Sequence, residues 1–276
     1  MGAAFALASA GVFGAADFLG GYASRSASAR SVALLAYLAG AVATALGLIV
    51  FGGVWSMGSI GFGLLAGLAG AIGLILLFSG FARGTFQIVS PAAAVMSGLV
   101  PVAWGVGSGE EPSGLAIAGL LLAPVGVWIL AGGTARLPAR ADLESSLFGL
   151  GSGLGFGVFF VCLAQAPDDG GLVPVIAARG SSIVVVVVSI LILGGPMVPA
   201  VGRVAAIASG VLDPVANGLF LLAAQSGQLF VVGALVALFP VSNALLARFI
   251  LKERLSRLQG VGFALALLAG AALAVG

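Results

Sequence analysis

Long apolar runs constrain the fold of this chain more than any other feature of the sequence. A helix needs about 20 apolar residues to cross the hydrocarbon core of a bilayer, and the 276-residue chain contains ten such runs joined by short connections. The connections are too short to hold a separate extramembrane domain, so the sequence predicts an all-α membrane protein. The predicted spans are residues 2–23, 31–52, 59–82, 85–107, 113–133, 146–166, 172–194, 204–224, 228–250 and 258–276.

The composition agrees with a multi-pass protein whose surroundings are the lipid bilayer. Only 7% of the residues are charged, whereas soluble domains carry about 25%. The formal net charge of +2 gives no reason to expect nucleic acid as a partner. With no histidine and one cysteine, Cys162, we expect no metal site, no haem and no other cofactor. The chain also lacks the clustered nucleophile and base that a membrane enzyme would need, so we expect no enzymatic activity.

The longest charged connection, residues 135–146, divides the chain into two halves of five spans each. We predict that residues 1–135 form one unit and residues 146–276 a second. Because five is an odd number, the second half enters the membrane in the opposite sense to the first. This arrangement is an inverted repeat, the architecture of many secondary transporters.

Both halves contain a proline inside an apolar span, a glutamate at the end of that span and a glycine in the next span. The residues are Pro101, Glu110 and Gly119 in the first half and Pro240, Glu253 and Gly260 in the second. This order resembles the EamA repeat of the drug/metabolite transporter superfamily. Phe13-Gly14 is similar to an aromatic–glycine position of that family, and Ala16-Asp17-Phe18-Leu19-Gly20-Gly21 resembles a bacterial subgroup of it.

The resemblance implies ten transmembrane helices in two inverted five-helix halves around a central cavity, working by alternating access. Members of the family are similar in exporting or exchanging amino acids, other metabolites, drugs or nucleotide sugars. We therefore expect a secondary active transporter, an exporter or exchanger, of small organic metabolites such as amino acids, or of drugs, in the bacterial cytoplasmic membrane. The sequence has no nucleotide-hydrolysing loop, so an ion gradient, with protons as one candidate, or a solute gradient would supply the energy. A passive channel or facilitator is the alternative.

A carboxylate, a proline and an amide lie close together inside the eighth predicted span. Asp213 and Asn217 are four residues apart, so they share one face of a helix. Pro214 removes a backbone donor beside them. Because a charge in the bilayer centre costs about 2.5–3.5 kcal/mol or more, we interpret the cluster as part of a polar pathway. The alternative is a structural hydrogen-bonding pair between packed helices.

Two further charged residues occur within or at the start of predicted spans. Asp17 is interpreted either as a cavity-lining carboxylate that binds a cationic group or a proton, or as a partner of Arg25. Arg179 is interpreted either as an inward-facing binding group for a carboxylate or phosphate, or as a side chain that reaches the headgroups or pairs with Asp168 and Asp169. If protons drive transport, Asp213 or Asp17 would carry them.

Uncharged polar residues and prolines complete the candidate pathway. Gln87, Ser90 and Ser97 mark one side of the fourth span, and Asn243 lies in the ninth; each is either a cavity-lining group or a hydrogen-bonding tie between helices. Helix breaks or hinges are expected at Pro101, Pro214 and Pro240.

The basic residues predict an orientation in the membrane. Of eleven Lys and Arg residues, we place ten at one membrane face and Arg179 alone at the other. Because positive charge concentrates in cytoplasmic loops, this count favours both termini outside the cytoplasm. The family is more often drawn with both termini inside, so the orientation stays open. Glu110, Glu111 and Glu253 are expected to fix loops by pairing and capping.

Overall fold

The computed structural model describes residues 1–83, 86–130, 140–194, 200–250 and 257–275. The described residues form α-helices and one short 3-10 helix, η1 (Asp168–Gly170), with no strand among them. The α-helices are α1 (Gly2–Ser24), α2 (Ala29–Phe51), α3 (Met57–Arg83), α4 (Phe86–Gly107), α5 (Gly114–Leu130), α6 (Arg140–Ala164), α7 (Val173–Leu193), α8 (Ala200–Ser226), α9 (Leu229–Val236), α10 (Phe239–Ile250) and α11 (Arg257–Val275).

The predicted spans correspond closely to these helices. Seven helices of the described chain are long and apolar enough to cross a membrane, and the remaining spans are covered by shorter apolar helices. The prediction was wrong for the ninth span, residues 228–250, which is divided into α9 and α10. Ala237 and Leu238 form a turn between these helices, and Pro240 occupies the first turn of α10. Proline is tolerated there because the first-turn N–H groups have no partner within the helix.

Local sequence explains where α2 begins and ends. Ser28 has an extended backbone, and its Oγ accepts a hydrogen bond from the N–H of Ser31 at 3.2 Å, which is the usual N-cap arrangement. The helix stops at Gly52, whose φ of 68° is open to glycine at little cost. The N-cap at Ser28 and the glycine at position 52 thus set the two ends of this span.

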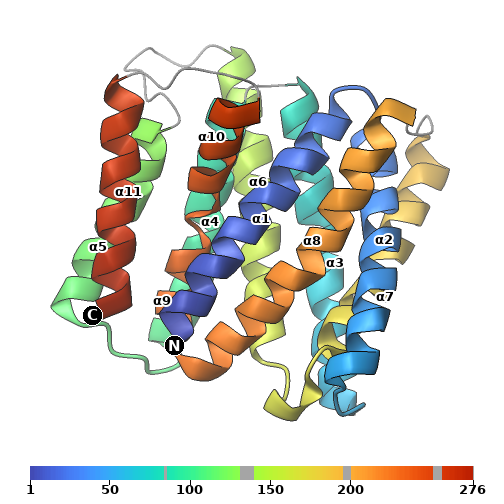
Figure 1. The fold of residues 1–276 in the computed structure, drawn as a ribbon, viewed down its shortest axis with the longest axis horizontal. Helices are drawn as coiled ribbons and strands as arrows, with labels where there is room; N and C mark the ends of the chain where they lie inside the picture. Colours follow the sequence, from blue (N-terminus) through green and yellow to red (C-terminus); the bar gives the residue numbers. More distant parts are fainter. Residues whose placement is uncertain (84–85, 131–139, 195–199, 251–256, 276) are drawn as a thin grey trace.

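Figure 1 shows the helices running side by side, with α5 and α11 as a pair at one edge and α2 and α7 at the other. Helices of one half pack on helices of the other: α1 on α8, α3 on α6 and α7, α4 on α6, and α5 on α11. Both termini lie at the same end of the molecule (Figure 1). This is the result expected for an even number of crossings.

Glycines allow the helices of the two halves to approach closely. A Cβ atom on Gly67 of α3 would overlap the carbonyl oxygen of Ala178 in α7, and one on Gly210 of α8 would overlap the carbonyl of Ala36 in α2. Burial of apolar surface against lipid supplies little drive for helix association, so such close backbone contacts contribute more. The two contacts hold α7 and α8 in place beside the charged residues described below.

We expect Gly67→Ala to destabilise the protein by about 1–3 kcal/mol, the usual cost of overpacking a close contact. Gly61→Ala is the matched control in the same helix, because a Cβ there meets no atom within 4 Å. That control should be neutral or stabilising by about 0.5–1 kcal/mol. The measurement is the free energy of unfolding of each purified variant in mixed micelles. Equal effects of the two substitutions would contradict the proposed α3–α7 contact.

Two of the predicted hinge prolines do not interrupt their helices. Pro214 lies within the continuous helix α8, and Pro101 lies within the continuous helix α4. Pro101 packs against α9, where a Cβ on Gly233 would lie 3.0 Å from the proline Cγ. Of the three prolines predicted to mark a break, only Pro240 does so.

Glu110 of the first half holds the start of α9 in the second half. Its Oε1 accepts a hydrogen bond from the N–H of Leu229 at 2.8 Å, and its Oε2 accepts one from the N–H of Phe230 at 2.9 Å. The carboxylate therefore satisfies two free N–H groups and lies at the positive end of the helix dipole. Capping was the role expected for Glu110; Glu253 lies outside the described residues.

We expect Glu110→Ala to destabilise the protein by about 2 kcal/mol, because two buried N–H groups lose a charged acceptor. The neighbouring Glu111 is exposed, so Glu111→Ala is a control that removes the same side chain without uncapping a helix. Thermal unfolding of the two variants checks the prediction. If both variants unfold at the same temperature as the wild type, the Glu110 cap does not contribute to stability.

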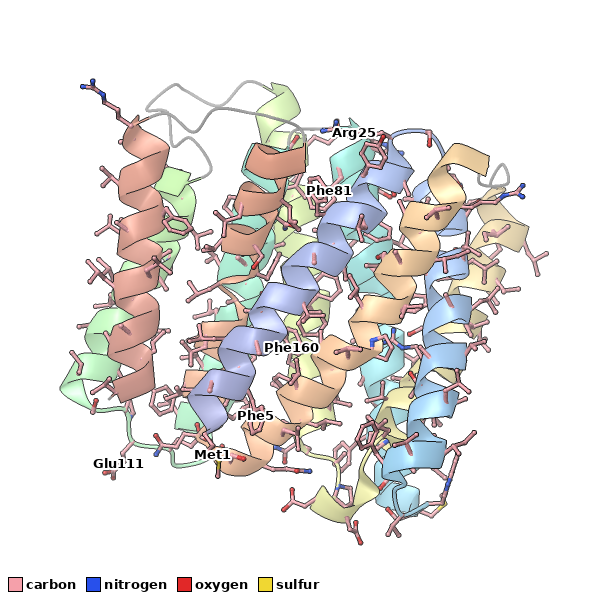
Figure 2. The ribbon with its side chains drawn as sticks, in the orientation of Figure 1. Met1, Phe5, Arg25, Phe81, Glu111 and Phe160 are labelled. Atoms are coloured by element: carbon pink, nitrogen blue, oxygen red, sulfur yellow. The ribbon has the colours of Figure 1, made fainter. Side chains whose placement is uncertain are left out.

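Arg25, which follows α1, lies at the end of the molecule opposite the N-terminus. Figure 2 shows Arg25 at one end, with Met1 and Glu111 at the other. The expectation that Arg179 lies at the membrane face opposite the other basic residues was wrong: it is 3% exposed, inside α7. The position of a residue along a predicted span does not show which neighbouring helices its side chain contacts.

Candidate functional site

A small cavity lies among helices from both halves of the chain. Its volume of about 40 Å³ is enough for roughly three water molecules. The lining comes from α1, α2, α3, α6, α7, α8 and α10 and combines charged side chains with aromatic rings. The lining residues are Phe13, Asp17, Tyr37, Gly70, Leu74, Phe156, Phe159, Phe160, Arg179, Ser182, Asp213 and Phe239.

Arg179 and Asp213 form an ion pair across this cavity, between α7 and α8. Nη2 of Arg179 donates to Oδ2 of Asp213. The guanidinium also lies 5.4 Å from the centre of the Tyr37 ring in α2, a distance at which the ring face attracts a cation. Headgroup contact and pairing with Asp168 and Asp169, one of the two interpretations of Arg179, are not observed, whereas the buried side chain faces inward, as the other interpretation had it, and its partner is a carboxylate of the protein itself. Arg179 and Asp213 were separate candidates in the sequence, and the fold brings them together.

Asn217 holds the Asp213 carboxylate from one turn further along α8. Its Nδ2 donates to Oδ2 of Asp213 at 2.9 Å and to the backbone carbonyl of the same residue at 2.9 Å. Asn217 is fully buried, and its Oδ1 has no hydrogen-bond partner. The structure therefore places Asn217 behind Asp213, where it orients the carboxylate.

Pro214 has a consequence for the helix that faces Arg179. Because proline has no N–H, the carbonyl of Gly210, four residues earlier, loses its usual helical donor. That carbonyl faces α2 at Gly40, where a Cβ would lie 2.8 Å from the Gly210 oxygen and 3.6 Å from Nε of Arg179. Nε itself has no hydrogen-bond partner. A close α2–α8 contact thus lies directly beside the ion pair.

Asp17 differs from Asp213 because its charge is not compensated. It is half-buried in α1 and lines the cavity. Within the described part of the chain it accepts no hydrogen bond and forms no ion pair, so the predicted alternative of an Asp17–Arg25 pair is not observed. Arg25 lies at the end of the molecule, whereas Phe160, which shares the cavity with Asp17, lies between the two ends (Figure 2).

Aromatic rings form much of the remaining wall, a feature that the sequence analysis did not identify. Phe160 packs edge-to-face against Phe13 at 5.5 Å and against Phe159 at 5.4 Å between ring centres. It also lies 4.8 Å from the ring of Phe220. Phe156, Phe159 and Phe160 have the spacing that places side chains on one face of a helix, so the signal was present in the sequence.

The uncharged polar candidates lie elsewhere. Nδ2 of Asn243 in α10 donates to Oγ of Ser90 in α4 at 3.3 Å, and Oγ of Ser97 donates to the carbonyl of Ala94 in its own helix at 3.1 Å. None of these residues lines the cavity. Asn243 and Ser90 thus form a tie between helices, one of the two roles considered for them. The Gln87 side chain lies outside the described part of the structure.

Comparison with known proteins gives a family match in the second half of the chain. Residues 144–275 match the sequence model of the EamA-like transporter family, so the resemblance drawn from the sequence is confirmed over this half. A solved structure titled only "Crystal structure of protein" has a TM-score of 0.71 at 15% identity and covers 97% of each chain. At this identity the likeness shows the fold alone. No protein of curated function matches the sequence.

Proposed function

We propose, from the EamA-like transporter match over residues 144–275, that this protein is a secondary active transporter of small organic solutes. The cavity between the halves is the solute site, and the two halves rock about it to open it alternately to each side of the membrane. The proposal extends to an inverted repeat of residues 1–135 and 146–276, exporting or exchanging metabolites or drugs across a bacterial cytoplasmic membrane.

The observation that carries this proposal is the charged cavity built from both halves. Intramembrane ionisable groups are costly and are retained where they serve a pathway. Asp17, Arg179 and Asp213 come from three different helices and line one cavity, which is the arrangement a solute site requires. The pairing of helices across the halves, α1 with α8 and α3 with α6, supports a shared interface on which the halves can move.

Asp17 is the better candidate for a coupling proton. Asp213 already forms an ion pair with Arg179 and accepts a hydrogen bond from Asn217. Asp17 has no such partner among the described residues, so a proton or a cationic solute can compensate its charge in turn. Arg25 lies at the end opposite Met1 (Figure 2), and this position favours both termini outside the cytoplasm.

The cavity volume favours a transporter over a passive channel. This cavity has a volume of about 40 Å³ and holds only a few water molecules, so an organic solute does not fit inside it in this conformation. A facilitator with a permanent pore would keep enough room for the solute. An alternating-access protein passes through a closed state of this kind.

Solute flux into reconstituted vesicles tests the proposal. The purified protein is tested with amines, amino acids, nucleosides and sugars, with and without unlabelled solute on the opposite side. We expect saturable uptake that is stimulated by the solute on the opposite side, because exchange requires a site exposed to one side at a time. Uptake that rises linearly with concentration and shows no exchange stimulation would indicate a channel or facilitator. Protein-free vesicles give the background.

A further inference from the structure

The charge balance of the cavity points to the sign of its ligand. Arg179 compensates Asp213, and Asn217 donates to the same carboxylate oxygen. Asp17 faces the cavity without an ion pair or hydrogen bond among the described residues. With all three groups ionised, the site carries a formal charge of −1 in surroundings where an uncompensated charge is costly.

The uncharged residues that line the cavity also favour a positively charged ligand. Besides Tyr37, five phenylalanines line the cavity, and Phe160 is held in this lining by edge-to-face packing on Phe13 and Phe159. Aromatic ring faces attract ammonium groups, and they also bind apolar or aromatic bodies. The five phenylalanine rings offer no hydrogen-bond donor to a carboxylate, so the hydroxyl groups of Tyr37 and Ser182 are the donors in the uncharged lining.

From these observations we propose that the site binds an organic monocation with an apolar, preferably aromatic, body. This proposal rests on the proposed transport function. Its ammonium group pairs with Asp17, and its body lies against the rings around Phe160. An anion would have to displace Asp213 from Arg179. A zwitterion would leave the net charge of the site unchanged and would bring a carboxylate for which no free cation is present among the lining residues.

Three probes with the same phenylethyl skeleton separate these classes: phenethylammonium, phenylalanine and 3-phenylpropanoate. They carry an ammonium group, both charged groups, and a carboxylate, respectively. Binding to the purified full-length protein in detergent is measured by calorimetry and by thermal stabilisation. We expect phenethylammonium to bind at least tenfold more tightly than phenylalanine, and 3-phenylpropanoate to show no measurable binding.

Variants locate the binding site. Asp17→Asn should weaken phenethylammonium binding at least tenfold, whereas Asp17→Glu should retain the preference for the cation. Phe160→Leu should weaken binding about threefold, in line with the loss of one cation–π contact. Glu111→Gln removes a carboxylate from an exposed position and should leave binding unchanged. The unfolding temperature of each variant without ligand shows that it is folded.

Tighter binding of phenylalanine or 3-phenylpropanoate would overturn the proposal. So would phenethylammonium binding that survives Asp17→Asn, or the absence of binding by all three probes at millimolar concentrations. Flux measurements separate this proposal from the transport function. If phenethylammonium binds as expected but does not cross reconstituted vesicles, the transport function fails and the ligand class stands. If only the zwitterion or the anion is transported, the transport function stands and the ligand class fails.

Discussion

Replacing Asp213 with leucine is expected to destabilise the protein by about 3–5 kcal/mol, the cost of leaving one partner of a buried ion pair alone. The Arg179 side chain is only 4% exposed, so the few water molecules that the cavity can hold compensate its charge poorly. Leucine has the branched shape of aspartate and a larger volume, so the substitution leaves no cavity behind. The free energy of unfolding in mixed micelles measures the effect.

The companion variants make this prediction specific. Arg179→Met should cost less than Asp213→Leu, because the remaining carboxylate is 30% exposed and keeps the hydrogen bond from Asn217. The double variant should recover much of the lost stability, since replacing both partners of a buried pair by apolar groups is often neutral. A double variant no more stable than Asp213→Leu, or a single variant within about 1 kcal/mol of wild type, would contradict the ion pair.

Asp17→Asn is expected to have the opposite effect on stability and a large effect on transport. Removing an uncompensated charge from a spanning helix should leave the free energy of unfolding unchanged or raise it by about 1–3 kcal/mol. Transport should fall at least about 100-fold, which corresponds to the loss of about 2.7 kcal/mol of interaction with the ligand. Stability gained at the expense of activity is typical of functional sites.

Two variants control for the change at position 17. Asp17→Glu keeps the charge and should retain part of the transport rate, and Glu111→Gln should transport at the wild-type rate. Flux and unfolding are measured on the same preparations. Transport by Asp17→Asn within threefold of wild type would remove Asp17 from the pathway. A marked loss of stability in that variant would show instead that Asp17 has a structural partner.

The sequence predicted the spans well because hydrophobic length is a local property. About 20 apolar residues are needed wherever a helix crosses, so nine of the ten predicted spans each correspond to a single helix in the described chain. The ninth span failed because proline has no N–H group to bond the carbonyl four residues earlier, and its ring clashes with that carbonyl; α9 ends at Val236, four residues before Pro240. At Pro240 these effects end α9 before the proline, whereas at Pro101 and Pro214 packing keeps the helix continuous.

The site was less predictable because it depends on how each helix is rotated toward its neighbours. Asp17, Arg179 and Asp213 were all identified as candidates, but their spacing along the chain contains no information about contact between α7 and α8. The Arg179–Asp213 pair therefore became visible only in the fold. The aromatic wall is different, because Phe156, Phe159 and Phe160 already show helical spacing in the sequence.

The most direct test of the central claim is the accessibility of the cavity from each side of the membrane. Ser182 lines the cavity and is 2% exposed, so a cysteine introduced there in a Cys162→Ala background reports on its opening. Ala116, fully buried in α5 and absent from the cavity lining, provides the control position for a second single-cysteine variant. A membrane-impermeant thiol reagent is applied to one side of oriented vesicles at a time.

Alternating access predicts that Ser182→Cys reacts from either side, that Ala116→Cys reacts from neither, and that the vesicles stay impermeable to the reagent. Reaction of Ser182→Cys from one side only would mean that the cavity is a binding pocket and not a transport path. A Ser182→Cys variant that stays unreactive from both sides, yet is labelled after denaturation, would contradict the assignment of this cavity as the solute pathway.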